Sequence, residues 1–167
     1  MIQVYTGNGK GKTTAALGLA MRAAGAGFNV YIGQFAKGRA YSELITLKRF
    51  KNIEVEQFGR RCFIKVKPDK KDIKLACDGF SRVKKVILNK KHRLVILDEI
   101  NIAIKFKLIS LREVMAILKT APKDIEIVLT GRYACPDIIR VADLVSEIKE
   151  KKHYYNKGVR ARKGIEF

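Results

Sequence analysis

The start of the chain combines glycines, lysines and hydroxyl groups in a pattern that can bind anions. Residues 2–14 read IQVYTGNGKGKTT, which is a short apolar run, a glycine-rich turn, a lysine and two threonines. Glycines allow such a turn to curl so that successive backbone N–H groups point at one anion, and a following helix adds its positive end. The pattern therefore predicts a phosphate-binding loop between a strand and a helix.

The polar positions of this loop have separate expected tasks. We expect Lys12 to neutralise phosphate oxygens and the Thr13 hydroxyl to bind a magnesium ion. Thr6 stands where the usual pattern has its first glycine, which is one departure from it. A turn that merely joins strand to helix is the alternative interpretation. The candidate polyphosphate-binding residues are Gly7, Asn8, Gly9, Lys10, Gly11, Lys12, Thr13 and Thr14.

A second candidate site follows an apolar segment in the middle of the chain. Residues 93–99 read RLVILDE, so Asp98 and Glu99 end a strand that should be buried. Proteins that bind nucleoside triphosphates place their metal-anchoring acid at such a position. One carboxylate can hold Mg²⁺ directly or through water, and a second can polarise a water or tune the metal. Two acids at a simple strand-to-loop transition are the alternative.

Length and composition indicate an ordinary globular protein. A chain of 167 residues, 47% of them hydrophobic, predicts one domain over 1–167 with a proper core. No apolar run approaches the ~20 residues that span a bilayer, and Met1 leads directly into the first strand without a signal peptide. The three cysteines form no Cys-x-x-Cys pair, which argues against a zinc site or a disulfide framework. We therefore expect a cytoplasmic protein with no membrane partner.

The chain is strongly basic, with 35 Lys and Arg against 16 Asp and Glu and a formal net charge of +19. Such a balance suits nucleic acid or a smaller polyanionic ligand. Residues 60–91 hold 12 basic and 3 acidic side chains but only Phe63 and Phe80 as aromatics, so base stacking is poorly supported. We interpret the excess as a lysine-rich solvated face, and expect no specific nucleic-acid partner.

Hydrophobic periodicity predicts strands that alternate with helices, the pattern of a mainly parallel sheet covered on both faces. Residues 101–108 are ambiguous between helix and loop. Ser110 and Glu113 have the spacing of a capping box, and Pro136 can begin a helix. Strands are expected at 2–5, 28–35, 53–58, 93–99, 124–130 and 144–148, and helices at 11–24, 42–50, 71–89, 110–119 and 136–142.

Several segments, taken in order, resemble one family over nearly the whole chain. They are TGNGKGKTTAALGLAMRAAGAG, GQFAKG, VILDEIN, VLTGR, ADLVSEI, and KH followed by KGVRARKGIEF. Together they resemble the cob(I)alamin, or ATP:corrinoid, adenosyltransferases of the corrinoid type. The phosphate loop is shared with many families, whereas LDEIN, LTGR and the terminal GIEF block are specific.

The resemblance implies a RecA-like P-loop NTPase fold, usually homodimeric, and a definite reaction. That family moves the 5′-deoxyadenosyl group of ATP to the Co(I) of a corrinoid and releases triphosphate, in the biosynthesis or salvage of adenosylcobalamin. Residues 8–14 would then wrap the triphosphate of ATP in reversed polarity, and Thr13 and Glu99 would hold Mg²⁺ with Asp98 nearby. Arg132 would reach the phosphates, so Lys12, Arg132 and Glu99 are the candidate catalytic residues. Gln34 and Lys37 line the same edge.

Two departures from the family fall on the corrinoid side. Members often begin with a segment that folds over the corrinoid, whereas this sequence opens almost at the strand. Many also carry a tryptophan in the loop that corresponds to 59–68, where this chain offers Phe58, Cys62 and Phe63. An electron donor such as a flavodoxin or another flavoprotein is an expected partner, because the corrinoid must be reduced.

The two histidines, His92 and His153, receive no metal role in this interpretation. His92 lies between Lys91 and Arg93 and is expected at the surface, and His153 is expected to help anchor the tail.

Three other functional classes of protein stay open. A nucleic-acid ATPase would bind DNA in a salt-dependent way and be stimulated by it. A thymidine-kinase-like enzyme would usually carry a cysteine-pair zinc site, and a nucleotide switch would bind ATP without turnover of reduced corrinoid.

Overall fold

The computed structural model describes residues 1–39, 41–60 and 68–167. Strands and helices alternate along them, as the periodicity predicts. In chain order the elements are β1 (Ile2–Thr6), α1 (Lys12–Gly25), β2 (Val30–Phe35), α2 (Ser42–Leu47), β3 (Ile53–Phe58), α3 (Lys70–Leu88), β4 (Leu94–Asp98), α4 (Ile100–Lys105), α5 (Leu111–Thr120), β5 (Glu126–Thr130), α6 (Pro136–Val141), β6 (Leu144–Glu147) and the 3-10 helix η1 (Tyr154–Lys157).

The strands of the described residues form one parallel sheet in the order β3-β2-β4-β5-β1-β6. β2 and β4 are buried along their whole length because helices cover both of their faces, and their sequences VYIGQF and LVILD are accordingly almost continuously apolar. The predicted α/β fold with a parallel sheet is confirmed. It is consistent with the P-loop NTPase-like architecture.

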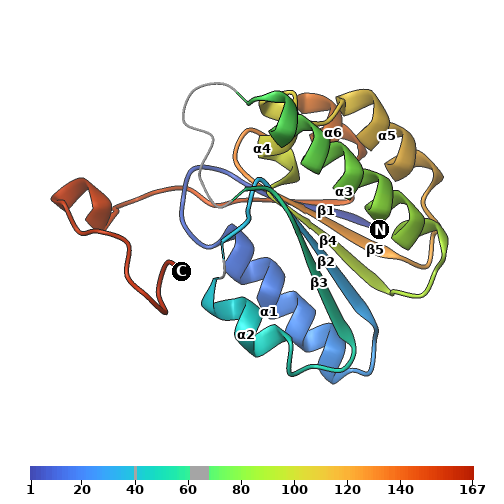
Figure 1. The fold of residues 1–167 in the computed structure, drawn as a ribbon, viewed down its shortest axis with the longest axis horizontal. Helices are drawn as coiled ribbons and strands as arrows, with labels where there is room; N and C mark the ends of the chain where they lie inside the picture. The colour runs from blue at the N-terminus through green and yellow to red at the C-terminus, as the bar shows by residue number, and fades with distance from the viewer. Residues whose placement is uncertain (40, 61–67) are drawn as a thin grey trace.

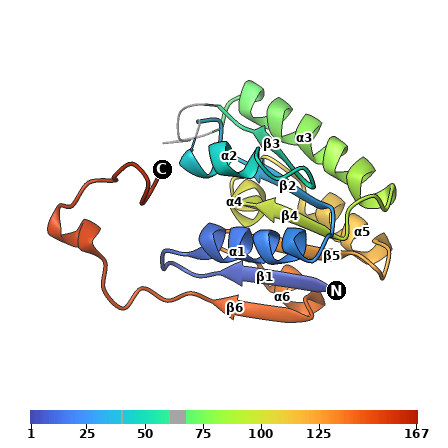
Figure 2. The same cartoon turned by 90° about the horizontal axis from the view of Figure 1, so that it is seen from below.

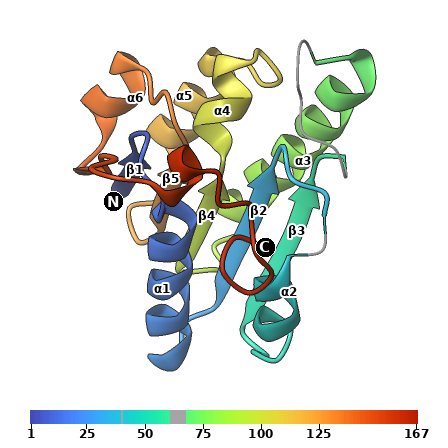
Figure 3. The same ribbon diagram turned by 90° about the vertical axis from the view of Figure 1, so that its left-hand side faces the viewer.

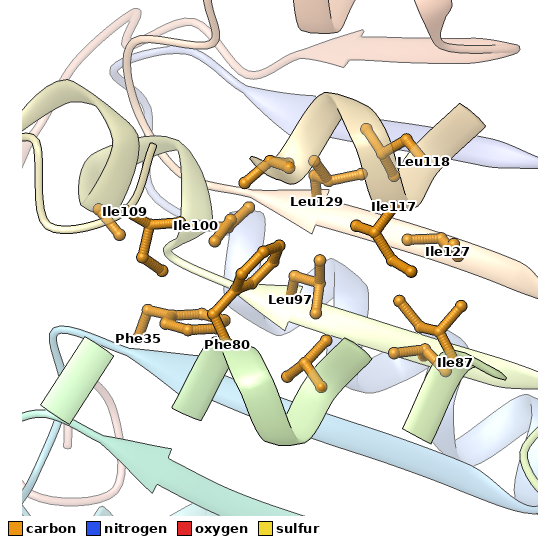
Figure 4. Packing of buried hydrophobic residues seen from close by; sticks show 14 of the residues in the cluster. Phe35, Phe80, Ile87, Leu97, Ile100, Ile109, Ile117, Leu118, Ile127 and Leu129 are labelled. Atoms are coloured by element: carbon orange, nitrogen blue, oxygen red, sulfur yellow. The ribbon is translucent and has the colours of Figure 1, made fainter. Parts of the chain in front are cut away.

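Two apolar clusters fill the space between the sheet and its helices. Helices α1 and α2 cover one face, and α3, α4, α5 and α6 cover the other (Figure 1). The larger cluster lies under the second group. In Figure 4, Phe80 of α3 lies beside Phe35 of β2, while Leu97 and Leu129 rise from the neighbouring strands. These clusters hold the strands in register, so that their carboxyl ends form one edge.

Helix beginnings differ from expectation in detail. α5 begins after Ser110 as predicted, but the Ser110 side chain makes no cap hydrogen bond, and the Glu113 carboxylate pairs with Lys84 at 3.0 Å. A capping box forms instead at α3, where Asp69 and Asp72 each accept from the other's backbone N–H. The ambiguous segment 101–108 is helical in its first part, since the short helix α4 runs over Ile100–Lys105. Cap choice therefore depends on which side chains lie nearby in space.

The prediction that His92 lies at the surface is wrong. Its side chain is buried, with 4% of the residue exposed, and its ring contacts the Tyr31 ring edge-on with 5.7 Å between centroids. His92 Nδ1 has no hydrogen-bond partner, and Nε2 lies 3.5 Å from a Glu54 carboxylate oxygen. Burial lowers the pKa of His92, and the nearby Glu54 charge only partly opposes it. Charged sequence neighbours suggested exposure, but the fold turns this one side chain inward.

We expect acidification to destabilise the fold through His92. Its folded-state pKa lies below the 6.5 of the unfolded chain, so the unfolded state binds more protons as the pH falls. The stabilising contribution is therefore present above about pH 6.5 and is lost below it. The measurement is the urea midpoint at pH 7.5 and 5.5. His92→Gln should flatten this difference relative to the wild type, while His153→Gln should leave it unchanged, and equal pH dependence in all three proteins would contradict the assignment.

The chain beyond β6 leaves the sheet and folds back toward it. In Figure 2 this segment runs out past the carboxyl ends of the strands through η1. Its end lies near α2 (Figure 3), where the Ser42 hydroxyl donates to Phe167 O at 3.0 Å. The His153 side chain accepts from Tyr155 N and caps η1. We call residues 151–167 the C-terminal tail.

None of the helices in the described ranges is long and apolar enough to cross a bilayer.

Candidate functional site: a nucleotide cleft at the strand ends

The polar residues singled out from the sequence gather at one edge of the sheet. β2, β4, β5 and β1 are consecutive neighbours, and all run in the same direction. Their carboxyl ends carry, in that order, Lys37, the pair Asp98 and Glu99, Arg132, and the glycine-rich loop. Ligands of open parallel sheets bind beyond such strand ends. Segments that are far apart in the sequence therefore form one site.

The glycine-rich loop is held by the segment after β6. Gly9 N donates to Ile148 O at 2.7 Å, and Ile148 N donates to Thr6 O at 2.8 Å. A Cβ on Gly7 would lie 2.4 Å from Ile148 O, and one on Gly9 would lie 2.9 Å from that oxygen. Both glycines are thus required by close backbone packing. Nothing in the sequence indicated that Ile148 supports the loop, because that contact depends on β6 pairing with β1.

Lys12 lies in the centre of the loop. Only 7% of the residue is exposed, and its ammonium donates to Gly7 O at 2.8 Å and Gly9 O at 2.6 Å. Burial lowers the pKa of Lys12, while the charge of Glu99 acts in the opposite direction. The Lys12 ammonium is therefore held against loop carbonyls in a buried place. A further anion nearby would favour its charged form, as the Glu99 carboxylate does.

Thr6 is accommodated where the usual motif has glycine. It is the last residue of β1, and its hydroxyl accepts a hydrogen bond from Ala134 N at 3.3 Å. The position is in a strand and needs no left-handed backbone. A threonine here therefore ties the loop to the segment after β5 and does not disturb it.

Asp98 is the most heavily bonded side chain of the site. Asp98 is 1% exposed. Its carboxylate accepts hydrogen bonds from four side chains, three of which belong to α1, β2 and β5 and one to the β2–α2 connection. They are Thr13 (2.9 Å), Thr130 (2.7 Å), Gln34 (3.2 Å) and Lys37 (2.7 Å). Burial acts to lower the pKa of Lys37, but the charge and hydrogen bond of Asp98, together with the charges of Glu99 and Glu43, outweigh it and raise that pKa overall. Asp98 is therefore a fully satisfied carboxylate behind the cleft.

Glu99 is the opposite case. It adopts a left-handed conformation with φ of 61° at the start of α4, and its Oε2 is buried without a hydrogen-bond partner. Burial, followed by the nearby Asp98 charge, raises the pKa of Glu99. Gly131 allows the carboxylate this place, since a Cβ on Gly131 would lie 3.1 Å from Oε2. An unsatisfied carboxylate facing a cleft is the type of group that a cation would complete.

Three of the five non-glycine residues with a left-handed backbone in the described ranges lie at this edge. Ala36 after β2, Glu99 after β4 and Tyr133 after β5 have φ of 53°, 61° and 66°. Non-glycine residues adopt such angles rarely and at an energetic cost, and they cluster where function needs them. Three adjacent strand ends carry this strain, which supports the placement of the site here.

A cleft of about 770 Å³ opens above these strand ends. Of the predicted residues, the loop from Gly9 to Thr14, Glu99 and Arg132 line it, together with Lys37. Arg132 is exposed in the turn after β5. Gly7, Asn8 and Asp98 do not line the cleft, because Gly7 lies against Ile148 and Asp98 is covered by its four donors. The remaining wall comes from α1, α2 with the preceding Tyr41, Ile102 of α4, and the C-terminal tail.

The tail contact was not foreseen. The Lys10 ammonium donates to Glu166 at 2.7 Å, to Tyr154 OH at 2.7 Å and to Ile165 O at 3.1 Å. The hydrogen bond from Lys10 is the largest cause of the lowered pKa of Glu166, and Tyr154 adds to it. The GIEF block therefore lies against the phosphate loop (Figure 3). Its sequence pointed to a family but not to this position.

The sequence offers Phe58, Cys62 and Phe63 in and beside the loop 59–68, where many family members carry a tryptophan. Phe58 packs against Phe35 with 5.3 Å between ring centroids. Cys62 and Phe63 lie outside the described residues.

The fold and the loop together define the class. A parallel sheet with a glycine loop between β1 and α1, a lysine at the start of α1, and an acid at the end of β4 is consistent with the P-loop NTPase-like class of folds. In the described part of the chain, no three His, Cys, Asp or Glu side chains gather into an all-protein metal site.

Comparisons with known proteins narrow the class to a family. The family model described as "ATP:corrinoid adenosyltransferase BtuR/CobO/CobP" matches residues 1–167. A corrinoid adenosyltransferase of Sinorhizobium sp is 36% identical over all of this chain and 80% of its own length, and one of Pseudomonas aeruginosa is 34% identical over all of this chain and 83% of its own. Corrinoid adenosyltransferase CobA of Salmonella typhimurium is 33% identical over all of this chain and 85% of its own. The chain belongs to the ATP:corrinoid adenosyltransferase family, whose members are transferases.

Proposed function

We propose that the protein transfers the 5′-deoxyadenosyl group of ATP to the Co(I) of a corrinoid and releases triphosphate. The observation that carries this proposal is the match to the family over the full chain, 1–167. The cleft supports it, because a phosphate loop, an unsatisfied carboxylate and an arginine meet at one edge.

In this proposal residues 9–14, which line the cleft, hold the triphosphate, and Gly7 and Asn8 complete the glycine-rich turn. Gly11 precedes α1 without a side-chain cap, so the first amides of the helix remain available to an anion. Lys12 would exchange its bonds to the loop carbonyls for phosphate oxygens. Arg132, exposed in the cleft wall, would reach the same phosphates and offset the charge that grows on the leaving group.

The residues present also fit a magnesium ion. The Thr13 hydroxyl at the start of α1 and the carboxylates of Asp98 and Glu99 at the end of β4 are hard oxygen donors, and Glu99 Oε2 has no hydrogen-bond partner. Mg²⁺ is commonly held by one or two carboxylates together with substrate phosphates, so an incomplete protein cage is the expected form. When bound, the ion would neutralise charge on the triphosphate.

The bond changes differ from those of ordinary phosphate-loop enzymes. Those enzymes direct a nucleophile at the γ-phosphorus and make ADP. Here the electron pair of Co(I) would form the bond to the ribose C5′, and the C5′–O bond would break with its pair leaving on triphosphate. Cobalt is thereby oxidised to Co(III). Co(I) is a strong nucleophile, so no general base is needed, and the protein's task is to orient C5′ and exclude water.

The proposal extends to the protein's partners, its oligomeric state and its location in the cell. The corrinoid must reach Co(I), so an electron donor such as a flavodoxin or another flavoprotein is a proposed partner. A homodimer is proposed by analogy with the family, and a cytoplasmic location is proposed because ATP is a substrate. No specific nucleic-acid partner is proposed.

The test is a product analysis. Enzyme, ATP, Mg²⁺ and chemically reduced corrinoid are mixed anaerobically, and the products are separated. We expect triphosphate and a light-sensitive corrinoid with a cobalt–carbon bond in equal amounts. The matched control is the same mixture with the corrinoid left as Co(III), which should give neither product. ADP and phosphate as the phosphorus products would refute the proposed reaction.

A further inference from the structure

Lys37 places a positive charge between two of the oxygens that are proposed to bind the metal. Its ammonium lies 2.7 Å from Asp98 Oδ2 and 3.3 Å from Thr13 Oγ1. Asp98 and Thr13 are themselves joined by a hydrogen bond of 2.9 Å. The side chain therefore bridges the end of β4 and the start of α1, which are the two elements that a magnesium ion would also bridge.

Burial explains why a cation is needed there. Asp98 is almost completely covered, and the Lys37 side chain is 14% exposed. A buried carboxylate without a nearby positive charge is costly, even when hydroxyl and amide donors surround it. Lys37 supplies that charge in the absence of a metal ion.

The backbone at Lys37 is fixed, so only its side chain is free to move away. A Cβ on Gly59 would lie 2.5 Å from Lys37 N, and a Cβ on Gly38 would lie 2.2 Å from Gly59 O. The segment 36–38 thus packs directly against the backbone that follows β3. The long side chain, in contrast, faces the cleft, where the Tyr41 ring lies 5.6 Å from the ammonium and Glu43 is a further lining residue.

We propose that Lys37 is a positioning residue that occupies the metal's place with its ammonium and leaves it when Mg²⁺ arrives together with the triphosphate. This inference rests on the proposed metal site. A metal ion alone would have to displace a resident cation and leave that cation without a partner. The Mg²⁺–triphosphate complex brings anionic oxygens to which the displaced ammonium can bind, so metal binding is coupled to nucleotide binding. Lys37 thereby prevents the site from being filled by metal alone.

The experiment measures metal binding without turnover. Mn²⁺ is the probe, because its free and bound forms are separated by electron paramagnetic resonance, and no corrinoid is added. We expect weak binding of Mn²⁺ alone to the wild type. Lys37→Met, which keeps the apolar stem and removes the charge, should bind Mn²⁺ alone about tenfold more tightly or better, because a charge at this range changes the proton affinity of a carboxylate by about 1–3 decades and should act on a bound cation in the same direction. Lys37→Arg keeps the charge and should remain weak.

A second readout separates this inference from the proposed function. Without metal, Lys37→Met should have a lower melting temperature than the wild type, and Mn²⁺ alone should restore it. Should Lys37→Met not fold, Lys37→Gln, which can still donate to Asp98, takes its place in both measurements. Equal affinity of the neutral variant and the wild type for Mn²⁺ alone would overturn the inference, while retained binding of Mn²⁺ with ATP to the wild type would leave the proposed metal site intact. Failure of the wild type to bind Mn²⁺ even with ATP would overturn both.

Discussion

Replacement of Lys12 by alanine is expected to lower turnover by roughly 10²–10³-fold, the loss seen when one donor to a developing oxyanion is removed. Lys12 is 7% exposed and is bonded to Gly7 O and Gly9 O at the centre of the loop. In the proposed reaction its charge stabilises a triphosphate that becomes more negative as the C5′–O bond breaks. Each tenfold loss corresponds to ~1.4 kcal/mol of transition-state stabilisation. The measurement is steady-state formation of adenosylated corrinoid under anaerobic conditions.

Lys10→Ala is the matched comparison for this variant. It removes the same charge two residues away, but the Lys10 ammonium is directed at Glu166 and Tyr154 of the tail. We expect a clearly smaller loss, because the side chain is half-exposed and already has these partners. Unchanged turnover in Lys12→Ala would refute the assignment of the loop. Equal losses in the two variants would mean that only the total charge matters.

Replacement of Glu99 by glutamine is expected to have opposite effects on activity and stability. Turnover should fall by about a hundredfold or more, because a bound metal ion contributes several kcal/mol of charge stabilisation and Glu99 is a proposed ligand. The unfolding free energy should rise by about 1 kcal/mol. Glu99 Oε2 is buried without a partner, and its pKa is raised by burial, so the ionised form is unfavourable in the folded protein. Activity and denaturant unfolding measure the two effects.

The neighbouring acid provides a control with the opposite sign. Asp98→Asn removes the charge that Lys37 and three further donors satisfy, and should cost about 3 kcal/mol of stability, as breaking a buried ion pair does.

The pH dependence of stability gives a second check on Glu99. A raised carboxyl pKa means that the folded state binds more protons, so the penalty from Glu99 is present above its folded pKa and disappears below the unfolded 4.5. The gain from Glu99→Gln should therefore be larger at neutral pH than in acid and should vanish below about pH 4.5, and a stability loss at pH 7 would contradict this account.

Much of the site could be predicted from local sequence because each part is a local motif. The glycine loop between a strand and a helix, the acids at the end of LVIL and the turn after IVLT are short patterns whose backbone geometry their own residues specify. Alternation of strand and helix then implies a parallel sheet, whose strand ends must share one edge. This is why the loop, Glu99 and Arg132 lie around one cleft as expected.

Which side chains meet depends on the order of the strands, because that order is set by packing between distant segments. The order β2-β4-β5-β1 brings Lys37 and Thr130 to Asp98, and pairing of β6 with β1 places Ile148 against Gly9. No local pattern specifies such contacts. His92 is buried although its sequence neighbours are charged, and α3 has the capping box that was expected at α5. Local sequence patterns therefore specify the chemical groups and the edge of the sheet at which they gather. Only the three-dimensional packing determined that Asp98 is satisfied, that Glu99 is not, and that Lys37 stands between the proposed metal ligands.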